Sequence, residues 1–127
     1  MSAQRLLFAQ LIVAVLLNIV QRVGLYYFSV DPNNGFFALS HFLGGVWIAL
    51  FIAWGYASFE KRFYPVIAVL AAFGVGLCWE YFEVAAGMTF VDAPRYMTDT
   101  ISDIVMDTVG GAFVAFVALK GGFFRKQ

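Results

Sequence analysis

The fold is decided by residues 77–111, LCWEYFEVAAGMTFVDAPRYMTDTISDIVMDTVGG, where two apolar segments flank a polar loop. Most acidic residues of the chain lie in this segment: Glu80, Glu83, Asp92, Asp99, Asp103 and Asp107. A charged group in hydrocarbon costs at least ~2.5–3.5 kcal/mol on insertion scales, so charges inside membrane-spanning segments usually mark an ion, proton or substrate site. We therefore expect the functional site in this segment.

The composition of the whole chain is that of a membrane protein. The 127 residues suffice for a single domain, 62% of them are hydrophobic, 13% are charged, and the mean hydropathy is +0.82. A soluble domain of this size could not bury so much apolar surface. The net charge is zero and no basic tract is present, so nothing supports nucleic-acid binding. We predict an all-α, multi-pass protein of the cell inner membrane or plasma membrane.

Four segments are long enough to cross a membrane, which takes ~20 mainly apolar residues. The predicted spans are about 6–28, 40–58, 65–86 and 99–120. The first 17 residues resemble a signal peptide without a small-residue cleavage site, and we interpret them as part of a retained first span. A turn is predicted at residues 31–35. Ser40 is expected to cap the second helix, and the fourth is expected to begin near Thr98 or Asp99.

The distribution of basic residues predicts the orientation in the membrane. An even number of spans places both termini on one side, and that side carries most of the Lys and Arg residues: Arg5, Lys61, Arg62, Lys120, Arg125 and Lys126. Only Arg22 and Arg95 fall on the other side. Because cytoplasmic loops are enriched in Lys and Arg, both termini are predicted to be cytoplasmic. His41 and the acidic residues then belong to the outer half of the membrane.

Residues four apart share a helix face, and each predicted helix has a face with small residues in its inner half and polar residues in its outer half. These four stripes are Gln10, Ala14, Asn18 and Arg22; His41, Gly45, Ala49 and Ala53; Ala68, Ala72, Gly76 and Glu80; and Asp99, Asp103, Asp107, Gly111 and Ala115. Small residues allow close helix packing in membranes. We expect the stripes to face one another in a four-helix bundle, with a tight inner floor and a wider polar cup that opens outward.

Carboxylates gathered in such a cup need cations or shared protons, because like charges in a poor dielectric repel. The predicted metal ligands are Glu80, Glu83, Asp99, Asp103 and Asp107. Oxygen-rich ligands with one imidazole favour Mg²⁺, Mn²⁺ or Ca²⁺ over Zn²⁺. His41 and Glu83 are candidate catalytic acids or bases, and Arg22 and Arg95 are candidates for binding phosphate. Alternatively, Asp99 only caps its helix, and the other acids form a hydrogen-bonded network that joins the helices.

The order of these motifs resembles a known family. The motifs are a His-Phe pair followed by Gly at His41, Phe42, Gly44 and Gly45, a Glu-x-x-Glu at Glu80 and Glu83, and an acidic helix with Asp99, Asp103, Asp107 and Gly110. Over about residues 40–115 this pattern resembles the YjdF-like inner-membrane family and, more distantly, the VanZ-like proteins. YjdF-like proteins have no assigned activity and typically carry additional spans, whereas VanZ-like proteins are associated with glycopeptide resistance, which implies a place in the cell envelope.

Three functions are compatible with an acidic site in the outer half of the membrane. The first is a metal-dependent hydrolase or phosphotransferase that acts on a membrane lipid or a lipid-linked phosphate. The second is a cation or proton-coupled transporter. The inner halves of the spans carry almost no polar residue besides Gln10, so this function would need a homo-oligomer whose interface supplies the path. The third is a non-catalytic scaffold subunit that binds a partner membrane protein through its small-residue stripes.

Overall fold

The computed structural model describes residues 2–28 and 36–121 and consists there of four helices without a β-strand. The helices are α1 (Ala3–Phe28), α2 (Phe37–Ser58), α3 (Pro65–Ala85) and α4 (Tyr96–Lys120). Each is long and apolar enough to cross a membrane. The predicted all-α membrane bundle is therefore confirmed. The turn predicted at residues 31–35 lies outside the described residues.

The helix starts differ from those expected at three of the four helices, and α1 begins at Ala3 instead of near residue 6. α2 begins at Phe37, and the Ser40 hydroxyl donates a hydrogen bond of 2.6 Å to the Phe37 carbonyl instead of capping the helix. A serine can make this bond from within a helix, so its presence does not fix the helix start. α4 begins at Tyr96, after Arg95 in a left-handed conformation with φ of 68°. Asp99 falls in the first turn, where its charge suits the helix dipole.

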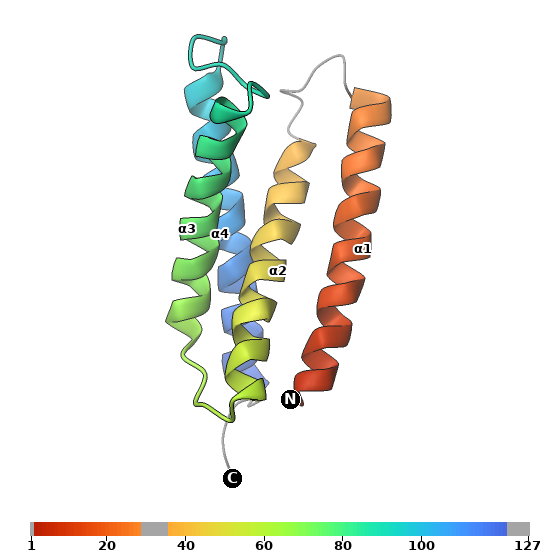
Figure 1. The fold of residues 1–127 in the computed structure, drawn as a ribbon, viewed down its shortest axis with the longest axis vertical. Coiled ribbons are helices and arrows are strands. Elements are labelled where there is room, and N and C mark those ends of the chain that lie inside the picture. Colours follow the sequence, from red (N-terminus) through yellow and green to blue (C-terminus); the bar gives the residue numbers. More distant parts are fainter. Residues whose placement is uncertain (1, 29–35, 122–127) are drawn as a thin grey trace.

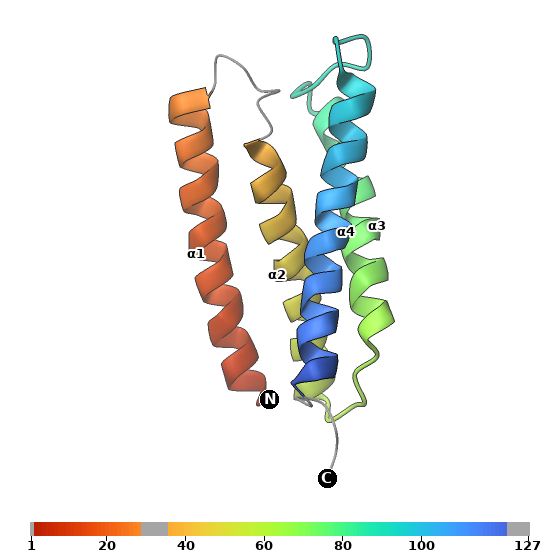
Figure 2. The same ribbon diagram turned by 180° about the vertical axis from the view of Figure 1, so that it is seen from behind.

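Three helices form the centre of the bundle and the fourth lies beside it. α2, α3 and α4 each pack against the other two, whereas the described part of α1 packs against α2 alone. Figures 1 and 2 show α1 at the edge of the molecule, next to α2. α1 begins at the same end of the bundle at which α4 ends (Figure 1), as an even number of spans requires.

Small residues fill the half of the bundle in which α1 begins and α4 ends. Buried on α2, α3 and α4 are Ala49, Ala53, Ala68, Ala72, Gly111, Ala115 and Ala118. The stripe predicted on α3 is therefore buried along its whole length, those on α2 and α4 are buried from their second member onward, and the tight floor of small residues is present.

The stripe predicted for the first helix is wrong beyond Gln10. Ala14, Asn18 and Arg22 are exposed, and α1 instead buries Leu6, Gln10 and Gly24 against its neighbour. A step of four residues turns the helix by about 40° more than a full turn, so three steps carry a stripe about 120° off the contact face. The stripes on the other helices drift by the same angle, but each of α2, α3 and α4 packs against at least two helices and buries a wider face, so most of their stripe residues stay inside the bundle.

Glycine brings the backbones of α2 and α4 into direct contact. A Cβ atom added to Gly45 would overlap the backbone carbonyl of Asp107, and one added to Gly110 would overlap the carbonyl of Phe42. Since only glycine lacks a Cβ, these two positions set the distance between the helices. This close approach brings the short side chain of Asp107 within reach of α2.

Packing of α1 on α2 can be tested at Leu6, which is 1% exposed. We expect Leu6→Ala to lower the free energy of unfolding by roughly 1–3 kcal/mol because it opens a cavity at this contact. Leu7→Ala is the matched control, since Leu7 is 47% exposed on the same helix turn. The measurement is unfolding of the detergent-solubilised protein by added denaturing detergent. Equal losses for the two variants would contradict the contact.

Candidate metal centre

The polar residues of the site lie in the half of the bundle opposite the tight floor of small residues, that is, away from the end at which α1 begins and α4 ends. His41 is in the second turn of α2, Glu80 lies near the end of α3, and Asp103 lies in the N-terminal half of α4. The antiparallel order of these helices brings their polar ends together. Glu80 and Asp103 are 6% and 7% exposed, so they are buried although neither is apolar.

His41, Glu80 and Asp103 converge on one point. Each offers one ligand atom, and the three atoms lie within 4.8 Å of one another. The His41 Nε2 atom is 3.6 Å from Asp103 Oδ2. Two ligands of one metal ion with bonds of about 2.1 Å lie ~3.0 Å apart in octahedral and ~3.4 Å apart in tetrahedral geometry, so both atoms are near enough to share an ion. The spacing therefore suits a shared metal ion better than a direct hydrogen bond.

One buried oxygen in this cluster has no partner. Among the described residues, Glu80 Oε1 is a buried side-chain atom without a hydrogen bond. The Thr100 side chain interacts with the same carboxylate, but this leaves Oε1 unsatisfied. A buried polar atom that lacks a partner costs ~1–3 kcal/mol or more, so such atoms usually mark a missing ion or water. This oxygen and its two neighbours fit a bound cation.

Asp107 lies one helix turn deeper than Asp103 and contacts the opposite edge of the imidazole. Its Oδ2 atom is 3.1 Å from His41 Nδ1. Asp107 is not a member of the converging set, although we predicted it as a ligand. The sequence feature that permits the contact between His41 and Asp107 is the presence of glycines at positions 44 and 45 of α2 and 110 of α4, which let the two helices approach closely. These glycines do not show which acid the histidine contacts.

The other predicted site residues lie outside the cluster. Glu83 accepts a hydrogen bond of 2.8 Å from Trp79 Nε1 on the same helix, and Asp99 is exposed. Arg22 is exposed and donates a hydrogen bond of 3.1 Å to Asn18, while the exposed Arg95 precedes α4. The structure does not bring any of these four into the converging set, and their roles stay predictions.

The predicted wide polar cup is wrong for the described part of the chain. The side chains of His41, Asp103 and Asp107 are only 11–12% exposed, so the centre is nearly closed. The reason is the close approach of α2 and α4, which leaves little room between the polar halves of the helices.

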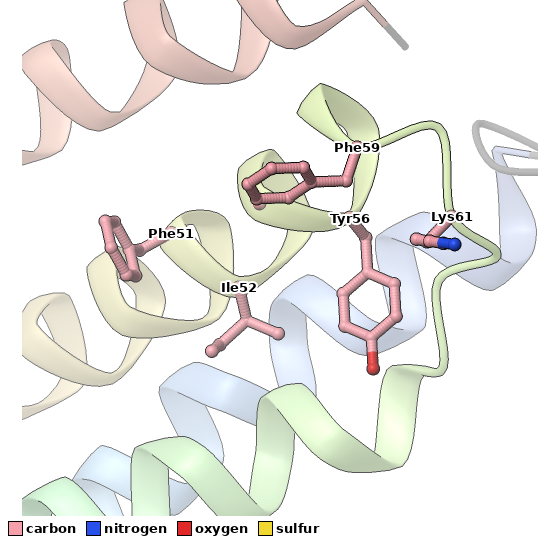
Figure 3. A pocket seen from close by; sticks show the side chains of 6 residues that line it. Phe51, Ile52, Tyr56, Phe59 and Lys61 are labelled. Atoms are coloured by element: carbon pink, nitrogen blue, oxygen red, sulfur yellow. The ribbon is translucent and has the colours of Figure 1, made fainter.

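A separate groove lies on α2, near its C-terminal end and far along the helix from His41. Aromatic and aliphatic side chains form most of its wall, and Lys61 stands at one end (Figure 3). The lining residues are Phe51, Ile52, Gly55, Tyr56, Phe59 and Lys61. None of them is acidic, so this groove is separate from the cluster of His41, Glu80 and Asp103.

The fold and the cluster define a class: a four-helix membrane protein whose polar half holds a buried set of acidic side chains around one imidazole. The chain belongs to the family described as predicted membrane protein (DUF2238), whose model matches residues 2–121. This is the family of the YjdF-like proteins, so that resemblance is confirmed, whereas the likeness to VanZ-like proteins is not shown. Neither a curated protein nor a solved structure matches the chain.

Proposed function

We propose that the protein is a metal-dependent hydrolase or phosphotransferase that acts on a lipid or lipid-linked phosphate at the outer surface of the membrane. The observation that supports this proposal is the unpartnered Glu80 Oε1 atom beside His41 and Asp103. Two carboxylates and one imidazole suit Mg²⁺ or Mn²⁺, and Zn²⁺ also accepts these ligand types.

Three protein ligands leave coordination positions free for water and substrate. A divalent metal in such a site lowers the pKa of bound water and polarises a phosphoryl oxygen. The protein itself would supply two carboxylates to hold the cation, a nearly buried setting that limits access of bulk water, and basic side chains in the same half of the molecule. Arg22 near the end of α1 and Arg95 before α4 are the candidates for binding the phosphate.

The packing below the cluster favours an enzyme over a transporter. Ala49, Ala72 and Gly111 are buried between α2, α3 and α4 in the half away from the acids. The buried Gln10 amide on α1 donates to the Leu6 carbonyl of its own helix. A transported ion needs polar groups or water along its whole path, and the described residues offer none through this floor.

The test uses protein purified in detergent with a tag that contains no histidine. Metal content is measured by mass spectrometry after equilibration with Mg²⁺, Mn²⁺, Ca²⁺ or Zn²⁺, and phosphate release is measured from phosphatidic acid and from an isoprenyl diphosphate in mixed micelles. We expect about one metal ion per chain and metal-dependent phosphate release from one of the two lipids. Metal binding without phosphate release would disprove the enzymatic proposal. Metal-dependent ion flux in proteoliposomes would instead show that the protein is a transporter.

A further inference from the structure

Asp107 is held by the backbones of two neighbouring helices. A Cβ atom added to Gly76 of α3 would lie 2.8 Å from Asp107 Oδ2 and 3.1 Å from its Cβ. A Cβ atom added to Gly44 of α2 would lie 3.3 Å from Asp107 Oδ1. A Cβ atom essentially never lies 2.8 Å from another heavy atom in a folded protein, and the other two distances are tight. The carboxylate therefore occupies a slot that only glycine residues leave open.

The slot fixes which atoms Asp107 can reach. Its Oδ2 atom lies 3.1 Å from His41 Nδ1, and a carboxylate without a proton can only accept a hydrogen bond. Nδ1 must then carry the proton and donate it to Asp107. In the neutral imidazole the other ring nitrogen, Nε2, is then left without a proton, and it faces Asp103 at 3.6 Å.

This arrangement separates the acids into two roles. Glu80 and Asp103 converge with His41 and include the unpartnered oxygen, whereas Asp107 is enclosed by Gly44 and Gly76 and already accepts from the imidazole. A histidine that binds a metal usually donates its second N–H to a carboxylate, which fixes the ring and its tautomer. The enclosed acid matches this supporting role and not that of a ligand.

We propose that Asp107 is a positioning residue that holds His41 in the Nδ1–H tautomer, so that Nε2 is the metal ligand together with Glu80 and Asp103. The inference rests on the proposed metal centre, since it assigns roles within it. It implies that the glycines at positions 44 and 76 serve the site by leaving room for the carboxylate. A network that merely joins the helices would need no particular tautomer.

The experiment exploits the fact that His41 is the only histidine in the chain. Protein labelled with ¹⁵N-histidine gives one pair of imidazole nitrogen signals, and their shifts report which nitrogen carries the proton. Spectra are recorded in detergent without metal, at alkaline pH where the imidazole is neutral, and again after addition of Zn²⁺. The variants are Asp107→Asn and, as a control acid at the same imidazole, Asp103→Asn.

For the unchanged protein we expect a proton on Nδ1, and a shift of the Nε2 signal when Zn²⁺ is added. Asp107→Asn introduces an amide that can donate to Nδ1, so the proton should move to Nε2, as happens when the acid of a Ser-His-Asp triad is changed in this way. Its Zn²⁺ affinity should fall by about 10–100-fold, with binding still reaching one ion per chain. Asp103→Asn should keep the proton on Nδ1.

The inference is overturned if the unchanged protein carries the proton on Nε2, or if Asp107→Asn leaves the tautomer unchanged. A second variant, Gly76→Ala, displaces the carboxylate without altering any charge and should also move the proton to Nε2. Circular dichroism checks that each variant is folded. If His41 carried its proton on Nδ1 but the protein did not bind Zn²⁺, the proposed metal centre would be disproved while the orientation of His41 by Asp107 would stand. The two proposals can therefore fail independently.

Discussion

Asp103→Asn is expected to abolish metal binding while making the metal-free protein more stable. The side chain is buried, lies 3.6 Å from His41 Nε2 and belongs to the converging set with Glu80. Loss of a direct ligand should exceed the 10–100-fold loss of affinity that follows removal of a supporting group, so we expect a decrease of more than ~100-fold. Phosphate release should fall in parallel.

The opposite effect on stability follows from charge. Without metal, Asp103, Glu80 and Asp107 place three carboxylates around one imidazole, and like charges in a poor dielectric repel. Removing one of these charges should raise the denaturing-detergent midpoint of the metal-free protein. Addition of metal at about 100 times its Kd should stabilise the unchanged protein by ~2.7 kcal/mol and leave Asp103→Asn unaffected.

The matched control is Asp92→Asn, which removes an exposed carboxylate from the loop at the same end of the bundle. Its metal affinity should equal that of the unchanged protein, and so should its unfolding midpoints in denaturing detergent with and without metal. If Asp103→Asn bound metal normally, the converging set would not be a metal centre. If it destabilised the metal-free protein, the acids would act as a hydrogen-bonded joint between the helices.

Much of the fold could be predicted from the sequence because a membrane imposes strong constraints. A span needs about 20 apolar residues with all backbone groups bonded internally, so hydropathy alone identifies four helices. Helix starts were less predictable, as Ser40 shows, because serine bonds to a preceding carbonyl as readily as it caps. The position of α1 could not be foreseen either, since apolar faces suit lipid as well as a neighbouring helix.

The sequence predicted the region of the candidate site and two of its acids as metal ligands, but not the role of His41 or which of the other acids lie outside the converging set. Glu80 and Asp103 were identified by the cost of burying acids in apolar segments, and the structure places both beside His41. Which acid reaches which nitrogen depends on distances of a few tenths of an ångström between helices. The spacing by four residues treats Asp99, Asp103 and Asp107 alike, yet Asp99 is exposed and Asp107 is enclosed.

Gly45→Ala is expected to lower both the free energy of unfolding and the metal affinity. This is the opposite of the usual effect of a glycine-to-alanine substitution on helix stability. Replacing glycine by alanine inside a helix normally stabilises it by about 0.5–1 kcal/mol. Here the new Cβ would overlap the backbone carbonyl of Asp107, and a helix backbone cannot rotate away as a side chain can. Such overpacking costs ~1–3 kcal/mol or more, so the free energy of unfolding should fall.

Gly45→Ala should also disturb the contacts of His41, because α2 must move away from α4 to accommodate the new Cβ atom. The 3.1 Å contact between His41 Nδ1 and Asp107 Oδ2 lies between these helices, so it should lengthen and metal affinity should drop. Gly55→Ala on α2 is the matched control, since a Cβ there meets no atom within 4 Å and should leave stability equal or higher. Unfolding in denaturing detergent and metal titration of both variants provide the measurement. If Gly45→Ala and Gly55→Ala unfolded at the same detergent concentration, the backbones of α2 and α4 would not be in direct contact at Gly45. The orientation of His41 by Asp107 would then lose its structural basis.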